Sequence, residues 1–449
     1  MLDPGVVFLN HGSFGSCPRP VLTFQSRIRR RLERQPVRFF VRELEGLLDQ
    51  ARAGLAAFVG AVPDDVVFVP NATAGVNTVL RSLSFRRGDE LVVSDHEYNA
   101  CRNTLDFVAG RSGARVIEVR IPFPLRAPGQ IIEAVLERVS ARTRLALLDH
   151  VTSQTGLVLP LERLVRLLTD RGVDTLVDGA HAPGMLPLDL QRLGAAYYTG
   201  NCHKWLCAPK GAGFLHVRSD RQKTIRPLSI SHGANSPRTD RSRFLIEFDW
   251  TGTWDPSAYL TVPEAIRFMS ALLPGGWPAI MQRNRQLAIA ARNRLCDALH
   301  LPPPCPEELL GSLASVPIAD ARDRAPPASP LYADPLQDWL KTACQIEVPV
   351  IPWPAPPKRL LRISAQLYNA LPQYDVLARA MQQSTKPVSG SGNDPSLEIS
   401  HRSTAATEVG GTSSRESLIF GPRACLRRAL SALLRGRQGT RPSDKDSVR

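Results

Sequence analysis

Short apolar runs alternate with helix-like segments between residues 40 and 220. The runs predict seven strands, at 66–70, 90–95, 114–119, 144–151, 175–179, 195–200 and 211–217. Between several of them, stretches such as 74–83 and 161–172 carry apolar residues at helical spacing. This alternation is typical of an α/β fold with a mostly parallel central sheet flanked by helices. In such sheets ligands bind beyond the carboxyl ends of the strands.

The pattern changes near residue 250. Two helices are predicted at 256–273 and 278–299. Short strands follow at 311–318, 344–353 and 359–370, and a final helix at 373–383. We therefore expect an N-terminal segment at 1–15, a large α/β domain at 16–250 and a smaller α+β domain at 251–384.

The stretch 385–449 is rich in Ser, Thr and Gly and carries excess positive charge, which predicts a disordered tail. Within it, Leu426, Leu430, Leu433 and Leu434 share one face of an arginine-rich helical pattern. A solvated or self-docked helix is the favoured interpretation, and a membrane-surface or partner helix is the alternative.

Composition narrows the class of protein. The chain has 449 residues, 43% of them hydrophobic, which favours a globular protein of more than one domain. No apolar run is long enough to span a bilayer and the start lacks a signal-peptide pattern, so a cytoplasmic location is expected. The net charge of +14 is spread along the chain without a basic block interleaved with aromatics, which argues against nucleic-acid binding.

The eight cysteines are scattered through the sequence, which argues against a disulfide scaffold. Cys202 and Cys207 have no second pair at zinc-like spacing, so no metal site is expected.

Lysine is scarce, with seven lysines against forty-nine arginines, and Lys204 is the first of them. A lysine amine can lose its proton and add to a carbonyl, whereas a guanidinium cannot. Lys204 is therefore a candidate for covalent chemistry, although an ordinary surface cation is the plain alternative. Lys210 is a competitor, but it directly precedes a predicted turn into a strand, so Lys204 is preferred.

Two other strand ends carry candidate chemistry. Ala72 and Thr73 start a helix directly after a strand, where free amides and the helix dipole favour a phosphate. Asp178 ends an apolar strand, where a carboxylate requires a cation or donors, and His181 follows it. Each feature alone has a structural interpretation, as a helix cap or a buried histidine. Together with Lys204 on the same rim, they match the requirements of a pyridoxal phosphate enzyme.

Eight stretches in order along residues 8 to about 380 carry a family resemblance: FLNHGSFGSCP, NATAGVN, DHEYNAC, VTSQTG, LVDGAHAPG, GNCHKWLCAPKG, DWTGTWDPSAY and LRISAQLYN. By these motifs the chain resembles the class V aminotransferase family of fold-type I pyridoxal phosphate enzymes, in particular the members similar to isopenicillin N epimerase. The resemblance implies the fold-type I architecture and pyridoxal 5'-phosphate as cofactor.

It also implies roles for individual residues. Lys204 would form the Schiff base, Asp178 would bind the pyridine nitrogen and His181 would lie near the ring oxygen. Ala72, Thr73 and His203 would contact the phosphate, and His96, or else Tyr98, would stack on the face of the ring. Arg362 would bind the substrate carboxylate. Asn10 and His11 would fold over the substrate. Thr253 is expected to reach the phosphate of the neighbouring subunit in a homodimer, next to Trp254, which departs from the polar or charged residue usual there.

The resemblance leaves the reaction open. We expect removal of an α-proton by the freed Lys204, which serves epimerisation, transamination and C–S lysis alike. A cysteine desulfurase would also need a thiol near the substrate, and Cys344 is more readily interpreted as a packing residue of a strand. A non-catalytic cofactor-binding module that acts through its basic tail is the alternative of another class.

Overall fold

The computed structural model describes residues 2–321 and 334–384. Its main sheet contains β2 (Val66–Val69), β3 (Glu90–Ser94), β4 (Arg115–Val119), β5 (Thr143–Asp149), β6 (Asp174–Gly179), β7 (Tyr197–Asn201) and β8 (Gly213–Val217). The strand order is β2-β8-β7-β6-β5-β3-β4, and only β8 runs antiparallel to its neighbours. The six parallel strands therefore end at one side of the sheet. We call the residues at and just after the ends of β2, β3, β5, β6 and β7 (71–73, 95–98, 149–150, 178–181 and 201–204) the carboxyl edge.

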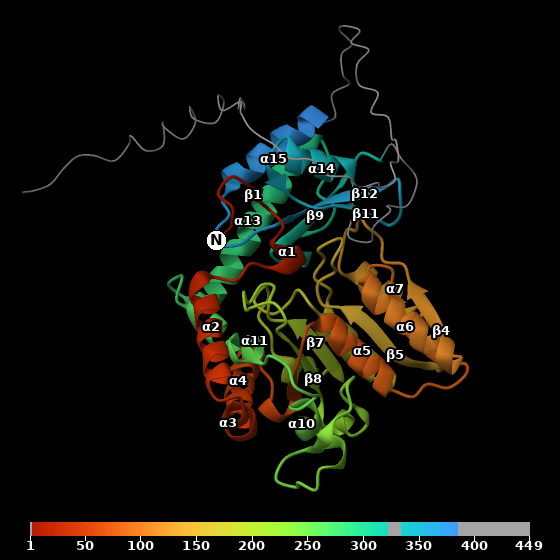
Figure 1. Ribbon diagram of the computed structural model, residues 1–449. Helices are drawn as coiled ribbons and strands as arrows, with labels where there is room; N and C mark the ends of the chain where they lie inside the picture. The colour runs from red at the N-terminus through yellow and green to blue at the C-terminus, as the bar shows by residue number, and fades with distance from the viewer. Residues whose placement is uncertain (1, 322–333, 385–449) are drawn as a thin grey trace, which may run out of the picture. The chain divides into compact units, whose positions relative to one another are not determined.

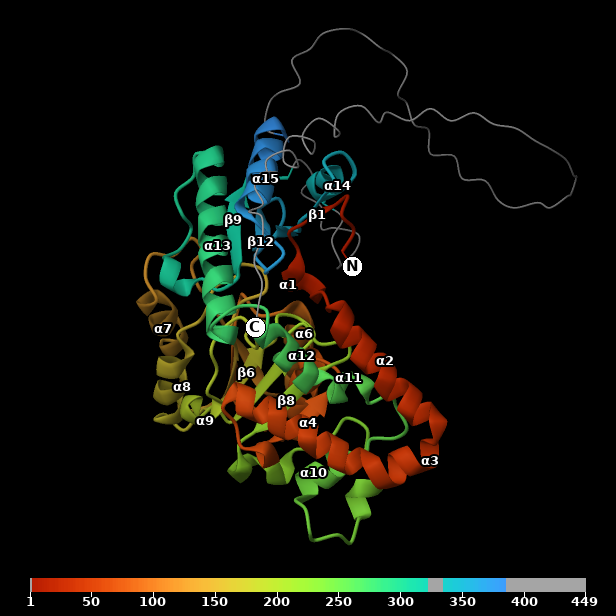
Figure 2. The ribbon, with the colours of Figure 1, turned by 90° about the vertical axis from the view of Figure 1, so that its left-hand side faces the viewer.

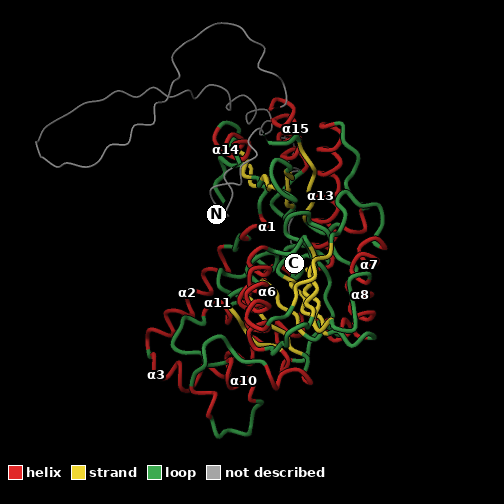
Figure 3. Tube along the Cα trace, turned by 90° about the vertical axis from the view of Figure 1, so that its right-hand side faces the viewer, coloured by secondary structure: helices red, strands yellow, loops and turns green. Residues whose placement is uncertain are grey.

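Helices bury both faces of this sheet. One face packs against α5 (Ala72–Ser82), α6 (Asn99–Ser112) and α10 (Arg243–Phe248). The other packs against α4 (Leu44–Val59), α7 (Gly129–Leu136) and α8 (Leu161–Thr169). Figure 3 shows the strands in yellow between α6 on one side and α7 and α8 on the other. Burial on both faces explains why β2 reads as an uninterrupted apolar run, Val-Val-Phe-Val.

The N-terminal helices lie along the flank of the sheet. α2 (Arg19–Arg34) and α4 are joined by α3 (Pro36–Arg38) and the π-helical turn η1 (Phe39–Glu43). Both long helices pack on α11 (Ser257–Leu260) and α12 (Val262–Ser270), as Figure 2 shows. The remaining short helices are η2 (Pro63–Asp65), α9 (Leu190–Leu193), η3 (Ser219–Thr224), η4 (His232–Asn235) and η5 (Glu307–Leu309).

A second, antiparallel sheet has the order β11 (Val350–Pro352), β12 (Arg359–Ser364) and β9 (Leu313–Ile318). The long helix α13 (Gly276–Leu299) packs on it together with α15 (Leu371–Ser384), and α14 (Pro335–Thr342) lies nearby (Figure 1). β1 (Val7–Phe8) pairs in parallel with β10 (Ile346–Glu347), which anchors the N-terminal segment to this part of the chain. The short helix α1 (His11–Phe14) follows directly.

The expected fold-type I architecture is present, and every strand predicted between residues 66 and 217 is found within a few residues of its expected bounds. The helices predicted after residue 256 are also found, as α11 with α12 and as α13. The predicted leucine-faced helix of the tail lies outside the described residues. None of the helices within 2–321 and 334–384 combines the length and hydropathy that a bilayer crossing requires.

Candidate active site

Lys204 lies just after β7, on the carboxyl edge, and its amine contacts a histidine. Its Nζ is 3.1 Å from His181 Nε2, and Trp205 Nε1 lies 3.3 Å from His181 Nδ1. An indole nitrogen only donates, so Nδ1 accepts from Trp205 and the ring proton of His181 is on Nε2. In its neutral form the Lys204 amine accepts from Nε2–H, which orients the nitrogen lone pair. Burial, followed by the charge of Arg362, lowers the pKa of Lys204 to about 8.

Lys210, the competing lysine, serves a different purpose. Its exposed amine donates to the Gly15 carbonyl at 3.1 Å and so holds the N-terminal segment against the turn that carries Lys204. Gly15 has a φ of +69°, and a Cβ atom there would lie 2.1 Å from the His203 carbonyl oxygen. The backbone of the N-terminal segment thus touches the backbone of the lysine turn.

Asp178 ends β6 in a buried position, with 2% of its surface exposed. Oδ2 accepts from the Cys101 thiol at 3.1 Å, and Oδ1 accepts from the Ala180 amide at 2.9 Å. Burial raises the pKa of Asp178, while its two donors and the nearby Lys204 lower it. Cys101 was not predicted from the sequence, and nothing in its surroundings on α6 distinguishes it from a packing residue.

Two further buried carboxyls, Glu97 and Asp149, lie behind Asp178. Burial, followed by the charge of a neighbouring carboxylate, raises the pKa of each well above its ordinary value. Asp149 ends the apolar strand β5, which is the same signal that singled out Asp178 in β6. The sequence could therefore have indicated Asp149, and the DHEYN motif contains Glu97.

The start of α5 presents its amides to the carboxyl edge. Asn71 caps the helix by accepting from the Ala74 amide at 2.9 Å, and the Ala72 amide donates to Asn201 Oδ1 at 2.8 Å. Asn201, at the end of β7, was not predicted. Its hydrogen bond joins the start of α5 to the segment after β7 that carries Lys204. The Thr73 amide, in the first turn of α5, has no acceptor within the helix and remains suited to an anion.

Arg362 is buried on β12, where its guanidinium approaches the N-terminal segment. Nη1 donates to the Ser153 carbonyl at 2.6 Å, and Nη2 donates to Ser13 Oγ at 2.8 Å and to Asn10 Oδ1 at 3.4 Å. The structure thus brings together Arg362 and Asn10, which lie 352 positions apart in the sequence. Ser13 and Ser153 were not predicted, because only the folded chain places them beside the guanidinium.

His11 occupies a more enclosed position than Asn10. Its Nδ1 pairs with the Tyr368 hydroxyl at 2.8 Å and its Nε2 with the Lys204 carbonyl at 3.1 Å. Burial lowers the pKa of His11 to about 4, so the ring is neutral near pH 7. His11 therefore links the N-terminal segment to the lysine turn, and its predicted contact with the substrate stays a prediction.

The three histidine and tyrosine candidates for the cofactor ring and phosphate differ in their surroundings. His96 is fully buried, bonded to Thr155 Oγ1 and the Ile121 carbonyl, with its ring 4.6 Å from that of Trp353. Tyr98 is 41% exposed. His203 is partly buried and its Nδ1 lies 3.0 Å from the Ala212 carbonyl. Which of His96 and Tyr98 covers a ring stays a prediction.

Thr253, the residue expected to reach a neighbouring subunit, is exposed in the bend before α11, whereas the adjacent Trp254 packs on Trp250.

The seven cysteines in the described part of the chain all have raised pKa values, and burial is the largest cause for each of them. Among them, Cys344 packs against the hydrophobic core. None of these seven thiols is therefore activated as a thiolate nucleophile.

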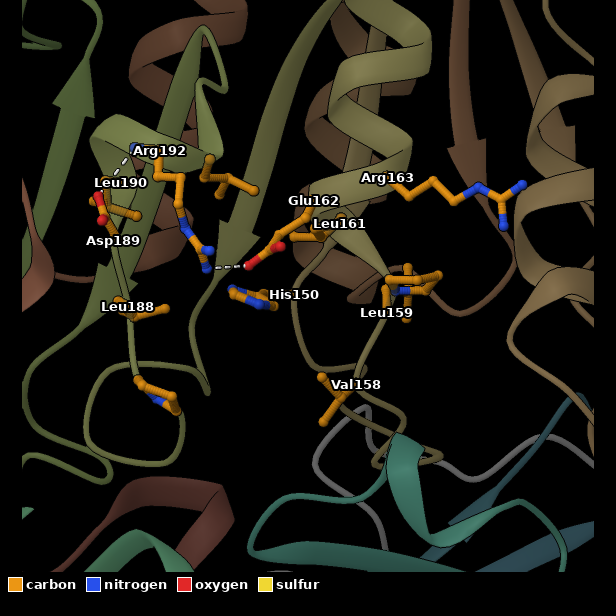
Figure 4. Close-up of a pocket in the computed structure, with 13 residues that line it drawn as sticks. His150, Val158, Leu159, Leu161, Glu162, Arg163, Leu188, Asp189, Leu190 and Arg192 are labelled. Carbon is orange, nitrogen blue, oxygen red and sulfur yellow. Dashed lines mark hydrogen bonds and ion pairs between the residues drawn. The ribbon is translucent and has the colours of Figure 1, made fainter. Parts of the chain in front are cut away.

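A cavity of about 390 Å³ opens elsewhere, between α8 and α9 (Figure 4). His150 lies beneath the ion pair that Arg192 forms with Glu162, and Arg163 points away from it. The His150 ring also pairs with the Tyr198 hydroxyl at 2.8 Å. No residue predicted for the active site lines this cavity.

Comparison with known proteins gives consistent matches. Residues 35–319 match the family model described as aminotransferase class-V. The chain is 38% identical over 399 residues to isopenicillin N epimerase of Amycolatopsis lactamdurans, which covers 86% of this chain and 96% of that protein. It is 32% identical over 400 residues to a probable chloroplastic L-cysteine desulfhydrase of Arabidopsis thaliana, covering 84% and 83%.

Solved structures show the same fold. The complex of the cystine C-S lyase C-DES with its product cysteine persulfide matches with a TM-score of 0.70 at 22% identity, covering 84% of this chain and 98% of that one. The cysteine desulfurase CsdA of Escherichia coli matches with a TM-score of 0.66 at 19% identity, covering 85% and 94%.

Proposed function

The chain belongs to the aminotransferase class-V family of fold-type I enzymes that depend on pyridoxal 5'-phosphate, and we propose that it epimerises the α-carbon of an amino acid or amino-acid-like substrate. The observation that carries the choice of reaction is the 38% identity to an isopenicillin N epimerase over 96% of that protein. The proposal assigns the chemistry to the carboxyl edge around Lys204.

The residues at this edge fit the cofactor. The buried Asp178 carboxylate has two protein donors for about four lone-pair sites, which leaves room for a protonated ring nitrogen. The Thr73 amide and the α5 dipole suit the phosphate, and the neutral amine of Lys204 suits attachment to the aldehyde. When bound, pyridoxal phosphate withdraws electrons from the α-carbon and so allows its proton to leave.

The protein residues would supply binding and proton transfer. Arg362 would hold the substrate carboxylate through paired N–H donors, in an orientation fixed by Ser153 and Ser13. Lys204 would take the α-proton on Nζ, and the His181 Nε2–H contact would orient that amine. Asn10, beside the guanidinium, would cover the bound substrate.

A second candidate reaction is C–S lysis of cysteine, because the chain is also 32% identical to a probable L-cysteine desulfhydrase. A desulfurase that uses a cysteine nucleophile is less well supported, since burial raises the pKa of Cys344 and of the other described thiols. Transamination would use the same residues, and it is distinguished from epimerisation by its product, a keto acid.

The proposal is tested by incubating the purified enzyme with a panel of amino acids and small peptides in heavy water. Epimerisation predicts deuterium at the α-carbon together with inversion of configuration, both absent in Lys204→Ala. Release of sulfide and pyruvate from cysteine without inversion would favour the lyase instead, and keto-acid formation would favour transamination.

We also propose a homodimer with shared sites, because Thr253 is exposed beside the sheet and the family resemblance assigns it to the neighbouring subunit's phosphate. Light scattering should give twice the chain mass of 49.3 kDa. Thr253→Val should weaken retention of the cofactor without changing the mass. A monomer that retains full activity would contradict this part of the proposal.

A further inference from the structure

Three carboxyl groups, among them the candidate ring-nitrogen partner Asp178, meet in one buried cluster. Glu97, Asp149 and Asp178 are 5%, 2% and 2% exposed. A side-chain oxygen of Glu97 lies within 4.8 Å of a side-chain oxygen of Asp178, and Asp149 on β5 pairs in register with Asp178 on β6. Three full negative charges in one buried cluster are mutually repulsive, so the cluster must hold protons.

The contact between Glu97 and Asp149 shows where a proton is held. The two carboxyl groups lie within hydrogen-bonding reach of each other. No other donor within the described residues serves Glu97 Oε2 or Asp149 Oδ2. A carboxylate only accepts, so this contact requires a proton on one of the two side chains.

The other groups around the cluster favour the charge on Asp178. Asp178 accepts from the Cys101 thiol and the Ala180 amide and lies near the Lys204 amine. Glu97 accepts from the Tyr98 amide, and the nearby guanidinium of Arg102 is already paired with Asp106 and Glu118. Asp178 therefore has the most stabilised negative charge of the three.

We propose that Glu97 and Asp149 are positioning residues that share one proton, so that the pair carries one negative charge instead of two and leaves Asp178 ionised, where it faces the cofactor's ring nitrogen. The inference rests on the proposed role of Asp178. The pKa shifts agree with this assignment. Burial raises the pKa of all three groups, but only those of Glu97 and Asp149 are raised well above their ordinary values.

The pair has a measurable consequence for stability. The pKa values of the pair are raised in the folded state. Its contribution to the free energy of unfolding is therefore complete below the pKa values of the unfolded chain, and it is lost as pH rises through the folded-state pKa values. The neutral variants Glu97→Gln and Asp149→Asn cannot ionise. We therefore expect the melting temperature of the holoenzyme of each variant, minus that of the parent, to rise by about 1–2 °C per pH unit from about pH 6 upward, until the pair in the folded parent loses its proton.

Glu90→Gln is a matched control. Glu90 is also buried, but hydrogen bonds from Ser140 and Arg142 lower its pKa, so its variant should differ from the parent by a constant amount over the same range. A constant difference in both Glu97→Gln and Asp149→Asn would overturn the shared proton. Each variant is measured separately, so loss of folding in one leaves the other as the test.

A second readout is the absorption of the bound cofactor titrated against pH. Loss of the shared proton in the parent gives the pair a second negative charge, which neither variant can acquire and which favours the protonated cofactor. At pH values above the pKa of the pair, both variants should therefore move the spectral transition downward by about 0.5–1 pH unit. An unchanged transition would contradict the assignment. A parent protein without the visible band would instead overturn the proposed function, while the melting data would still decide whether the pair shares a proton.

Discussion

At the scale of single residues, the proposed chemistry depends on a lysine whose pKa is lowered. The Lys204 amine contacts His181 Nε2, and burial with the charge of Arg362 lowers its pKa to about 8. We predict that the rate at which cofactor-free protein captures pyridoxal phosphate covalently rises with pH and levels off above about 8. Below that value the neutral fraction falls about tenfold per pH unit, because only the neutral amine adds to a carbonyl.

The control for this profile is Lys210→Arg, which preserves a donor for the Gly15 carbonyl. It should leave the profile unchanged, whereas Lys204→Arg should abolish covalent capture. A flat profile in the parent between about pH 6 and pH 9 would contradict a depressed pKa at Lys204.

Arg362 allows a second prediction at this scale. Arg362→Ala removes two charge-assisted donors from the predicted carboxylate clamp, so KM should rise about 10- to 100-fold while kcat changes less. Arg359→Ala on the same strand is the matched control, because Arg359 pairs with Asp334 instead. Steady-state kinetics that show equal losses in both variants would exclude a specific clamp.

Single residues were predicted from the sequence where a residue type was locally out of place. Asp178 was singled out because an acid ends an apolar strand, and Lys204 because lysine is scarce; the structure places both on the carboxyl edge. Asp149 carries the same signal as Asp178 and was missed. Asn201, Cys101 and Ser13 carry no local signal, because their contacts join elements distant in sequence.

At the scale of elements, the N-terminal segment depends on a close backbone approach. Gly15 combines a φ of +69° with 2.1 Å between a would-be Cβ and the His203 carbonyl. We predict that Gly15→Ala destabilises the protein by about 2 kcal/mol or more, because strain and a backbone clash add. Thermal unfolding measures the loss, and Gly110→Ala, with open space around its Cβ position in helix α6, is the control.

The accuracy of the element predictions follows from burial. The strands of the main sheet were found because helices cover both faces and leave long apolar runs. The reversed direction of β8 was not predicted, since side-chain periodicity carries no information on direction. The arginine-rich helix α2 was also missed, because few of its positions are buried and the apolar pattern is sparse.

At the scale of the whole molecule, distant parts of the chain meet at the carboxyl edge of one sheet. The motifs indicated the family and placed Lys204, Asp178 and Ala72 on a common rim. The resemblance also implied that Asn10, His11 and Arg362 would gather over the substrate, but the sequence did not predict the pairing of β1 with β10 or the hydrogen bonds from Arg362 to the N-terminal segment that bring α1 and β12 together. Such pairings are tertiary and leave no periodic trace in either segment.

The central claim is that the cofactor is attached to Lys204, and borohydride reduction followed by peptide mapping tests it most directly. The reduced holoenzyme should carry the cofactor mass on the peptide that contains Lys204 and on none of the other six lysines. Attachment at Lys210, or a protein that stays unmodified after reconstitution and reduction, would contradict the account.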